Sequence, residues 1–133
     1  MKKIEHIGIA VSNLEESNLI YSKLLNTQSY KTETVDSEGV ITSFFKAGDT
    51  KIELLQGTNE DNAISKFINK KGEGIHHIAF EVEDILSEIK RFKKEGFKII
   101  NETPKKGADN KLICFIHPKS SMGVLIELCQ EIK

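Results

Sequence analysis

Two stretches of this sequence carry nearly the same pattern, and their spacing constrains the fold more than any other feature. Ile4-Glu5-His6-Ile7 near the start matches Ile75-His76-His77-Ile78. The matched histidines, His6 and His77, are 71 residues apart, about half of the 133-residue chain. This offset indicates a duplicated module, with module one at about residues 1–72 and module two at about residues 73–133. Because a chain of this length lies in the usual range for one domain, we expect residues 1–133 to form a single domain.

The expected secondary structure of the two halves supports the duplication. Apolar residues at three- and four-residue spacing indicate helices, and polar breaks that contain glycine separate the strand-like runs. In the first half we expect strands at about residues 3–11, 28–35, 40–47 and 50–56, and helices at 14–25 and 62–70. In the second half we expect strands at about 75–82, 97–102, 111–117 and 123–130, and a helix from about 85 to 95. Apart from the additional helix at 62–70, both halves have the order β-α-β-β-β, which indicates an α+β fold.

The charge balance excludes two classes of partner. The chain has 19 Lys and Arg against 20 Asp and Glu, for a net charge of −1. No broad positive field is therefore available for nucleic acid or for an anionic membrane surface. No apolar run approaches the ~20 residues that span a bilayer. The first residues enter a strand without room for a signal peptide, so we expect a cytoplasmic protein.

The two cysteines favour a structural interpretation. Cys114 and Cys129 lie in apolar, strand-like segments and lack CxxC spacing. Buried, reduced thiols are the preferred interpretation over a disulfide or a metal role.

Strand periodicity separates the two adjacent histidines of the second module. Alternate side chains of a strand share a face, so His77 lies on one face and His76 on the other. His77 is thereby equivalent to His6, and we interpret His76 as a packing residue or as a support for the ligands.

The last expected strand of each module also carries one glutamate in an apolar run. These are Glu53 in Ile52-Glu53-Leu54 and Glu127 in Ile126-Glu127-Leu128. A carboxylate among strand aliphatics is costly unless it is paired, protonated or bound to metal. Two histidines and two glutamates, one of each per module, supply the N and O donors of a divalent-metal site. The sequence therefore predicts the ligand set His6, Glu53, His77 and Glu127.

Longer motifs around these residues point to a known family. The motifs are His6-Ile7-Gly8-Ile9-Ala10-Val11, Gly74-Ile75-His76-His77-Ile78-Ala79-Phe80-Glu81-Val82, His117-Pro118-Lys119-Ser120 and Gly123-Val124-Leu125-Ile126-Glu127-Leu128. Together they resemble the vicinal oxygen chelate, or glyoxalase-like, superfamily, and within it the methylmalonyl-CoA epimerase family. The resemblance extends from Ile4 to about Gln130.

The resemblance implies two paired βαβββ modules that form a cupped eight-stranded mixed sheet around a metal site. His6, His77 and Glu127 match the firmest ligand positions, and Glu53 matches a fourth that is Gln or Glu among relatives. It also implies one divalent ion per chain, with cobalt preferred and zinc, nickel and manganese open, and a homodimer. The activity implied is an isomerase of propionate metabolism that interconverts the S and R forms of methylmalonyl-CoA. A proton leaves and returns at C2 through a metal-stabilised enolate.

The same resemblance suggests roles around the reacting carbon. Glu127 is the first candidate for acid/base catalysis and Glu53 the second. Some relatives have a glutamate where this chain has Thr42, so we place Thr42 with the substrate-binding residues. Lys119, Ser120 and Ser121 are further candidates for contacts to the substrate carboxylate or the CoA chain. Lys105 and Lys106 could meet CoA phosphates.

Three other functions remain open within the same superfamily. A glyoxalase I-type lactoylglutathione lyase would keep the His and Glu ligands. A ring-cleaving dioxygenase usually uses two histidines and one glutamate, which a fourth ligand at Glu53 disfavours. A non-enzymatic small-ligand-binding protein would lack metal ligands, and all four candidates are present here.

Overall fold

The computed structural model describes residues 1–133 and contains three α-helices, eight β-strands and three short 3₁₀ helices. The chain divides into two compact units. The first unit is His6–His76, and the second unit is Met1–Glu5 together with His77–Lys133. None of the helices has the length and the apolar composition with which a helix crosses a bilayer.

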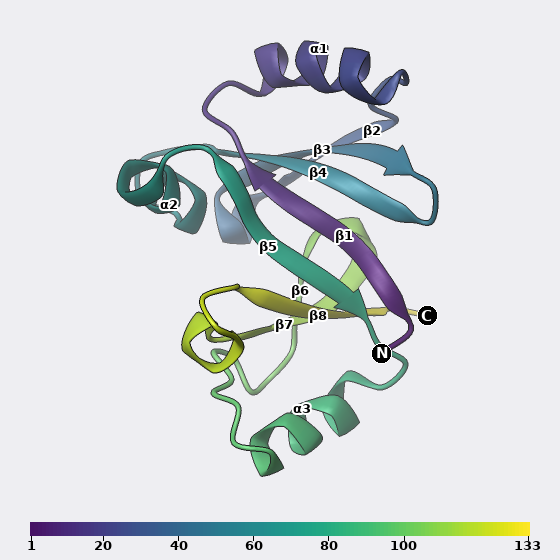
Figure 1. Cartoon of the computed structure of the whole chain (residues 1–133), viewed down its shortest axis with the longest axis vertical. Helices are drawn as coiled ribbons and strands as arrows, with labels where there is room; N and C mark the ends of the chain where they lie inside the picture. Colours follow the sequence, from purple (N-terminus) through teal and green to yellow (C-terminus); the bar gives the residue numbers. More distant parts are fainter. The chain divides into compact units, whose positions relative to one another are not determined.

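The first unit is a sheet with a helix on each of its faces. Its elements are β1 (Lys3–Ala10, of which His6–Ala10 belong here), α1 (Leu14–Leu25), β2 (Lys31–Val35), η1 (Asp36–Glu38), β3 (Val40–Ala47), β4 (Thr50–Gly57) and α2 (Ala63–Lys71). The strand order is β2-β3-β4-β1, with β1 parallel to β4 and the other pairs antiparallel. Helix α1 lies along β3 and β4 (Figure 1).

Side chains of β4 are buried on both faces of the sheet, which explains why a helix packs on each face. Leu54 lies in the cluster that receives Leu14, Tyr21 and Leu25 of α1. The next residue, Leu55, points to the other face and packs with Ile64 of α2. Both helices begin with an asparagine cap, because Asn13 and Asn62 each accept a hydrogen bond from an amide of the first turn. Glu53 has the parity of Leu55, so it faces away from α1.

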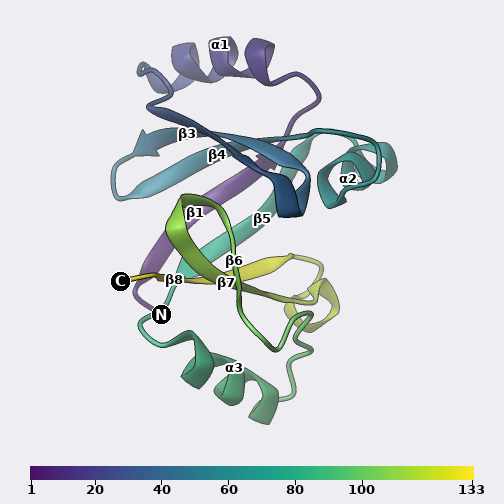
Figure 2. The ribbon, with the colours of Figure 1, turned by 180° about the vertical axis from the view of Figure 1, so that it is seen from behind.

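The second unit repeats this plan with one helix. Its elements are β5 (Gly74–Glu81, of which His77–Glu81 belong here), α3 (Ile85–Lys94), β6 (Lys105–Lys106), η2 (Ala108–Asn110), β7 (Lys111–Ile116), η3 (Pro118–Ser121) and β8 (Ile126–Glu131). The strand order is β5-β8-β7-β6, with β5 parallel to β8 and the other pairs antiparallel. Figure 2 shows the short β6 beside β7.

A single apolar cluster holds α3 to its sheet. Ile85, Ile89 and Phe92 of the helix pack on Cys114, Ile116 and Leu128 of β7 and β8. The opposite face of the same strands carries a second cluster with Ala79, Ile113 and Cys129. The predicted α+β fold with a repeated strand and helix order is confirmed.

One predicted strand is wrong. Residues 97–102 form no ladder strand, and only Ile99 makes an isolated bridge, to Ile116. Backbone bonds to β7 end at Ile100, whose amide donates to the Phe115 carbonyl. At the next residue the Asn101 side chain takes over: its Nδ2 donates to the Ile113 carbonyl at 3.2 Å, and its Oδ1 accepts from the Phe115 amide at 2.8 Å. The strand at this sheet edge is instead β6, which lies between the predicted strands at 97–102 and 111–117.

The last strand starts later than predicted. Strand β8 begins at Ile126 rather than at residue 123. The preceding η3 turn ends at Met122 in the left-handed region, with φ of 58°, and Gly123 follows with φ of 94°. Two successive positive φ values are incompatible with extended pairing, so the chain turns before it joins β7.

Replacement of Asn101 by alanine should destabilise the protein by about 1–3 kcal/mol, because two partly buried backbone groups lose their partners. The measurement is chemical denaturation of both proteins at one pH. The neighbouring Glu102→Ala is the control, since Glu102 makes only an exposed ion pair with Lys93. Equal stabilities of Asn101→Ala and Glu102→Ala would contradict this account of the segment.

Candidate functional site

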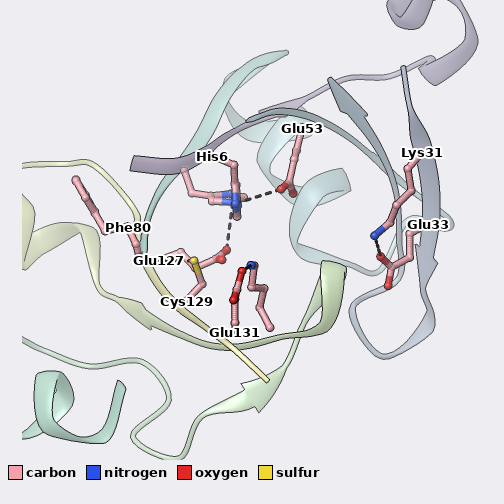
Figure 3. A network of polar contacts seen from close by, with 10 residues as sticks. His6, Lys31, Glu33, Glu53, Phe80, Glu127, Cys129 and Glu131 are labelled. Carbon is pink, nitrogen blue, oxygen red and sulfur yellow. Dashed lines mark hydrogen bonds and ion pairs between the residues drawn. The ribbon is translucent and has the colours of Figure 1, made fainter. Parts of the chain in front are cut away.

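The first unit holds a buried contact between a histidine and a glutamate. His6 Nδ1 and Glu53 Oε2 are 3.1 Å apart (Figure 3), and the two residues are 5% and 3% exposed. Parallel pairing of β1 with β4 sets Gly8 beside Glu53. His6 shares the face of Gly8, so its ring reaches the carboxylate along that face.

The second unit holds the same contact. His77 Nε2 and Glu127 Oε1 are 3.2 Å apart, and each residue is 5% exposed. Pairing of β5 with β8 sets Ala79 beside Glu127. The ring of Phe115 meets the His77 ring edge to face, with centroids 6.0 Å apart, which fixes the imidazole plane. In both units the histidine lies two residues before the residue that pairs with the glutamate in the neighbouring strand.

The donor atoms of each pair fit a divalent metal ion. Metal bonds of about 2.1 Å at near-right angles separate adjacent ligand atoms by roughly 3 Å. The observed separations of 3.1 and 3.2 Å match that spacing within each unit. Imidazole nitrogen and carboxylate oxygen are ligands for borderline divalent ions, and both kinds are buried here. The structure uses different nitrogens in the two pairs, Nδ1 in His6 and Nε2 in His77.

Strands β2 and β3 extend the face on which Glu53 lies. Thr42 is 1% exposed, and it has the parity of Phe44, which pairs with Glu53. Glu33 of β2 lies directly opposite Thr42, and its Oε1 is 3.5 Å from Lys31 Nζ (Figure 3).

Sequence reasoning did not single out Lys31 and Glu33. The lysine ammonium also lies over the Phe44 ring, at 4.8 Å from its centroid. The sequence of residues 31–35 has no apolar alternation that would mark them, although every second residue is partly buried in the structure.

The loop before β8 uses its polar groups to hold its own shape. Ser120 Oγ accepts from the Lys98 amide at 2.8 Å, and Ser121 Oγ donates to the Val124 carbonyl at 2.5 Å. The Lys119 amide donates to His117 Nδ1 at 3.1 Å, and the Lys119 side chain is exposed. The two hydroxyls therefore shape the loop, and the Lys119 ammonium is the charged group that it presents to solvent.

The other candidates are distributed as follows. The His76 ring packs edge to face on Phe67 of α2, with centroids 5.0 Å apart, in agreement with a packing role. Lys105 and Lys106 form the exposed edge strand β6.

Cys114 and Cys129 are free and buried, as predicted. Burial, with a smaller contribution from the charge of Glu127, raises the pKa of the Cys114 thiol to about 12. The same two causes, in the same order, raise the pKa of the Cys129 thiol even further.

Comparison with known proteins assigns the class. Residues 5–115 match the family described as the Glyoxalase/Bleomycin resistance protein/Dioxygenase superfamily. The chain belongs to this superfamily.

Relatives within this superfamily indicate a narrower family. The mitochondrial methylmalonyl-CoA epimerase of Dictyostelium discoideum is 40% identical over 95% of this chain and 76% of its own length. The ethylmalonyl-CoA/methylmalonyl-CoA epimerase of Cereibacter sphaeroides is 38% identical over 96% of this chain and 97% of its own. A solved methylmalonyl-CoA epimerase in complex with methylmalonyl-CoA and NH4+ is 32% identical with a TM-score of 0.94, covering 98% of this chain and 95% of that one. The resemblance to the methylmalonyl-CoA epimerase family is confirmed.

Both thiols should resist alkylation at pH 8 while the protein is folded. With a pKa of about 12, Cys114 is almost entirely protonated at that pH, and the thiolate is the reactive form. Unfolded thiols ionise near pH 8.5, so the folded state is penalised as pH rises from about 9 toward 12. Thiol labelling followed by mass spectrometry should show no adduct below pH 9 and two after denaturation. Rapid labelling of the folded protein at pH 8 would contradict the burial of these residues.

Proposed function

We propose that this protein is a metal-dependent methylmalonyl-CoA epimerase, which interconverts the S and R forms of the thioester by proton transfer at C2. The observation that carries the proposal is the buried histidine and glutamate pair, present at equivalent positions of both units. Buried ionisable groups in strands are costly, and two equivalent pairs are difficult to explain by folding alone. The epimerase relatives supply the substrate class.

The proposed ligand set for one divalent ion consists of His6, Glu53, His77 and Glu127. Such an N and O donor set accepts several borderline ions, among which cobalt is our first choice and zinc, nickel and manganese are alternatives. When bound, the ion would act as a Lewis acid that stabilises negative charge on the substrate oxygens.

The chain's own carboxylates would move the proton. The C2 carbon lies between a thioester and a carboxylate, so removal of its proton leaves an electron pair that delocalises onto oxygen. We assign removal of the C2 proton on one side of the carbon to Glu127. Glu53 is the candidate for return of a proton on the other side, because it is the equivalent carboxylate of the first unit. Each carboxylate is held by its histidine, which fixes its direction relative to the strand.

We propose further substrate contacts at Thr42 and Lys119. Thr42 lies on the face of Glu53, where a hydroxyl could meet the substrate. The Lys119 ammonium could bind an anionic group of the substrate. Ser120 and Ser121 would contribute mainly by shaping the loop that carries this lysine. A cytoplasmic homodimer stays a prediction.

The protein loaded with Co²⁺ should exchange the C2 hydrogen of methylmalonyl-CoA with solvent. In deuterated water, the proton NMR signal at C2 should disappear as the two epimers interconvert. A chelator should stop the loss, and added Co²⁺ should restore it. A protein that leaves the C2 signal intact, and instead converts the methylglyoxal–glutathione adduct, would be a glyoxalase-type lyase.

Replacement of each carboxylate by its amide tests the assignment of the acid and the base. Glu127→Gln and Glu53→Gln should each lower epimerisation by about 10²–10⁴-fold, the usual contribution of a general acid or base. Glu60→Gln, which changes an exposed carboxylate of the first unit, is the control and should keep the wild-type rate. Wild-type exchange in both site variants would remove Glu53 and Glu127 as proton carriers.

A further inference from the structure

Each unit contains a second repeated contact, which ties the acidic strand to the start of a helix. Gln56 Oε1 accepts a hydrogen bond from the Leu14 amide at 2.6 Å. In the other unit, Gln130 Oε1 accepts one from the Ile85 amide at 2.7 Å. Leu14 and Ile85 are the first residues of α1 and α3. The same amide is therefore bonded in the same way in both units.

The sequence places each glutamine at a fixed distance from a proposed ligand. Glu53 and Gln56 are the ends of a Glu-x-x-Gln segment, and so are Glu127 and Gln130. Residues three apart on a strand point to opposite faces. The glutamate thus meets its histidine on one face, while the glutamine reaches the helix on the other face. Each acidic strand is held from both sides.

A backbone hydrogen bond reinforces the glutamine in each unit. The Val11 amide donates to the Leu55 carbonyl, and the Val82 amide donates to the Cys129 carbonyl, both at 2.9 Å. The segment that leaves each histidine strand is therefore bonded at two successive residues of the acidic strand. We call this pair of bonds the register clamp.

The register clamp bears on the position of the glutamate. A slip of the acidic strand by two residues, the smallest slip that keeps the glutamate on its face, would move it by about 6.6 Å. The contacts of 3.1 and 3.2 Å between histidine and glutamate would then be lost. Ligand geometry needs to hold within about 0.5 Å, so even a partial shift would weaken an ion site.

Helix capping does not require that these acceptors come from the strand that carries the glutamate. The first four amides of a helix lack partners within the helix. Asn13 Oδ1 already accepts from the Glu16 amide at 3.0 Å, and Asp84 Oδ1 accepts from the Ser87 amide at 3.3 Å. A cap residue belongs to the helix segment itself, whereas each glutamine belongs to the strand that carries the glutamate. The glutamine therefore links the start of the helix to the strand that carries the glutamate.

We infer that Gln56 and Gln130 are positioning residues of the metal site, which hold each acidic strand in register with its histidine strand. This inference rests on the proposed metal-dependent function. It predicts that loss of the glutamine acceptor weakens metal binding, whereas loss of the neighbouring cap weakens only the helix.

The test compares three variants of the second unit by calorimetric titration with Co²⁺, at a temperature where circular dichroism shows each to be folded. Gln130→Leu removes the acceptor and should raise the dissociation constant by about 10- to 100-fold, as for other residues that support metal ligands. Gln130→Glu keeps an acceptor oxygen and should stay close to the wild-type affinity. Asp84→Ala removes the cap of the same helix and should lower the melting temperature while the affinity is retained. Gln56→Leu and Asn13→Ala repeat the comparison in the first unit. They serve as the test if a variant of the second unit does not fold.

Two results would overturn the inference. One is wild-type Co²⁺ affinity in both leucine variants. The other is an equal loss of affinity in Gln130→Leu and Asp84→Ala, which would trace the effect to helix stability. A wild-type protein that binds Co²⁺ without exchanging the C2 hydrogen would contradict the epimerase proposal and leave the register clamp intact. A wild-type protein that binds no Co²⁺ would remove both.

Discussion

The rest of the structure depends on the contact between a buried imidazole and a buried carboxylate, made once in each unit. Such groups lose their hydration when a strand carries them into an apolar layer, and the loss is recovered only through a close partner or a metal. The partner is close because a parallel pairing puts the glutamate beside the residue two positions after the histidine. The register of the paired strands therefore determines the geometry of the site.

In each unit the ionisable pair lies on one face of the sheet only. One face carries leucine and isoleucine side chains that pack against helices, as Leu54 does with α1 and Leu128 with α3. The other face carries the ionisable pair, together with Leu55 against Ile64 of α2 in the first unit and Phe115 against His77 in the second unit. Because adjacent residues of a strand alternate between the faces, a four-residue segment can serve both. The segments that end at Gln56 and Gln130 do so in both units.

The duplication made most of the fold predictable from the sequence. Helices with asparagine or aspartate caps and strands with clear alternation were found near their observed positions, and strand parity separated His77 from His76 correctly. The prediction failed at residues 97–102, where an apolar run looks like a strand. Asn101 uses its side chain to bond the neighbouring strand, and no local pattern distinguishes an asparagine that does so from one in a turn. The edge strand that forms instead has only two residues, Lys105 and Lys106, which is too short for any periodicity.

The candidate site was predictable only in part. Glu53 and Glu127 stood out because a charge inside an aliphatic run requires an explanation. Lys31 and Glu33 did not, because a lysine and a glutamate on an edge strand are ordinary surface residues until pairing with β3 is known. The roles of Thr42, Lys119, Ser120 and Ser121 depend on a bound substrate, which sequence patterns do not position.

The central proposal is that His6, Glu53, His77 and Glu127 bind one divalent ion per chain. Elemental analysis of the purified protein, after saturation with Co²⁺ and removal of excess metal, tests it most directly. The account predicts one ion per chain, and loss of that ion in both His6→Ala and His77→Ala. Two ions per chain, with one retained in each single variant, would show that the pairs act separately and would contradict the account.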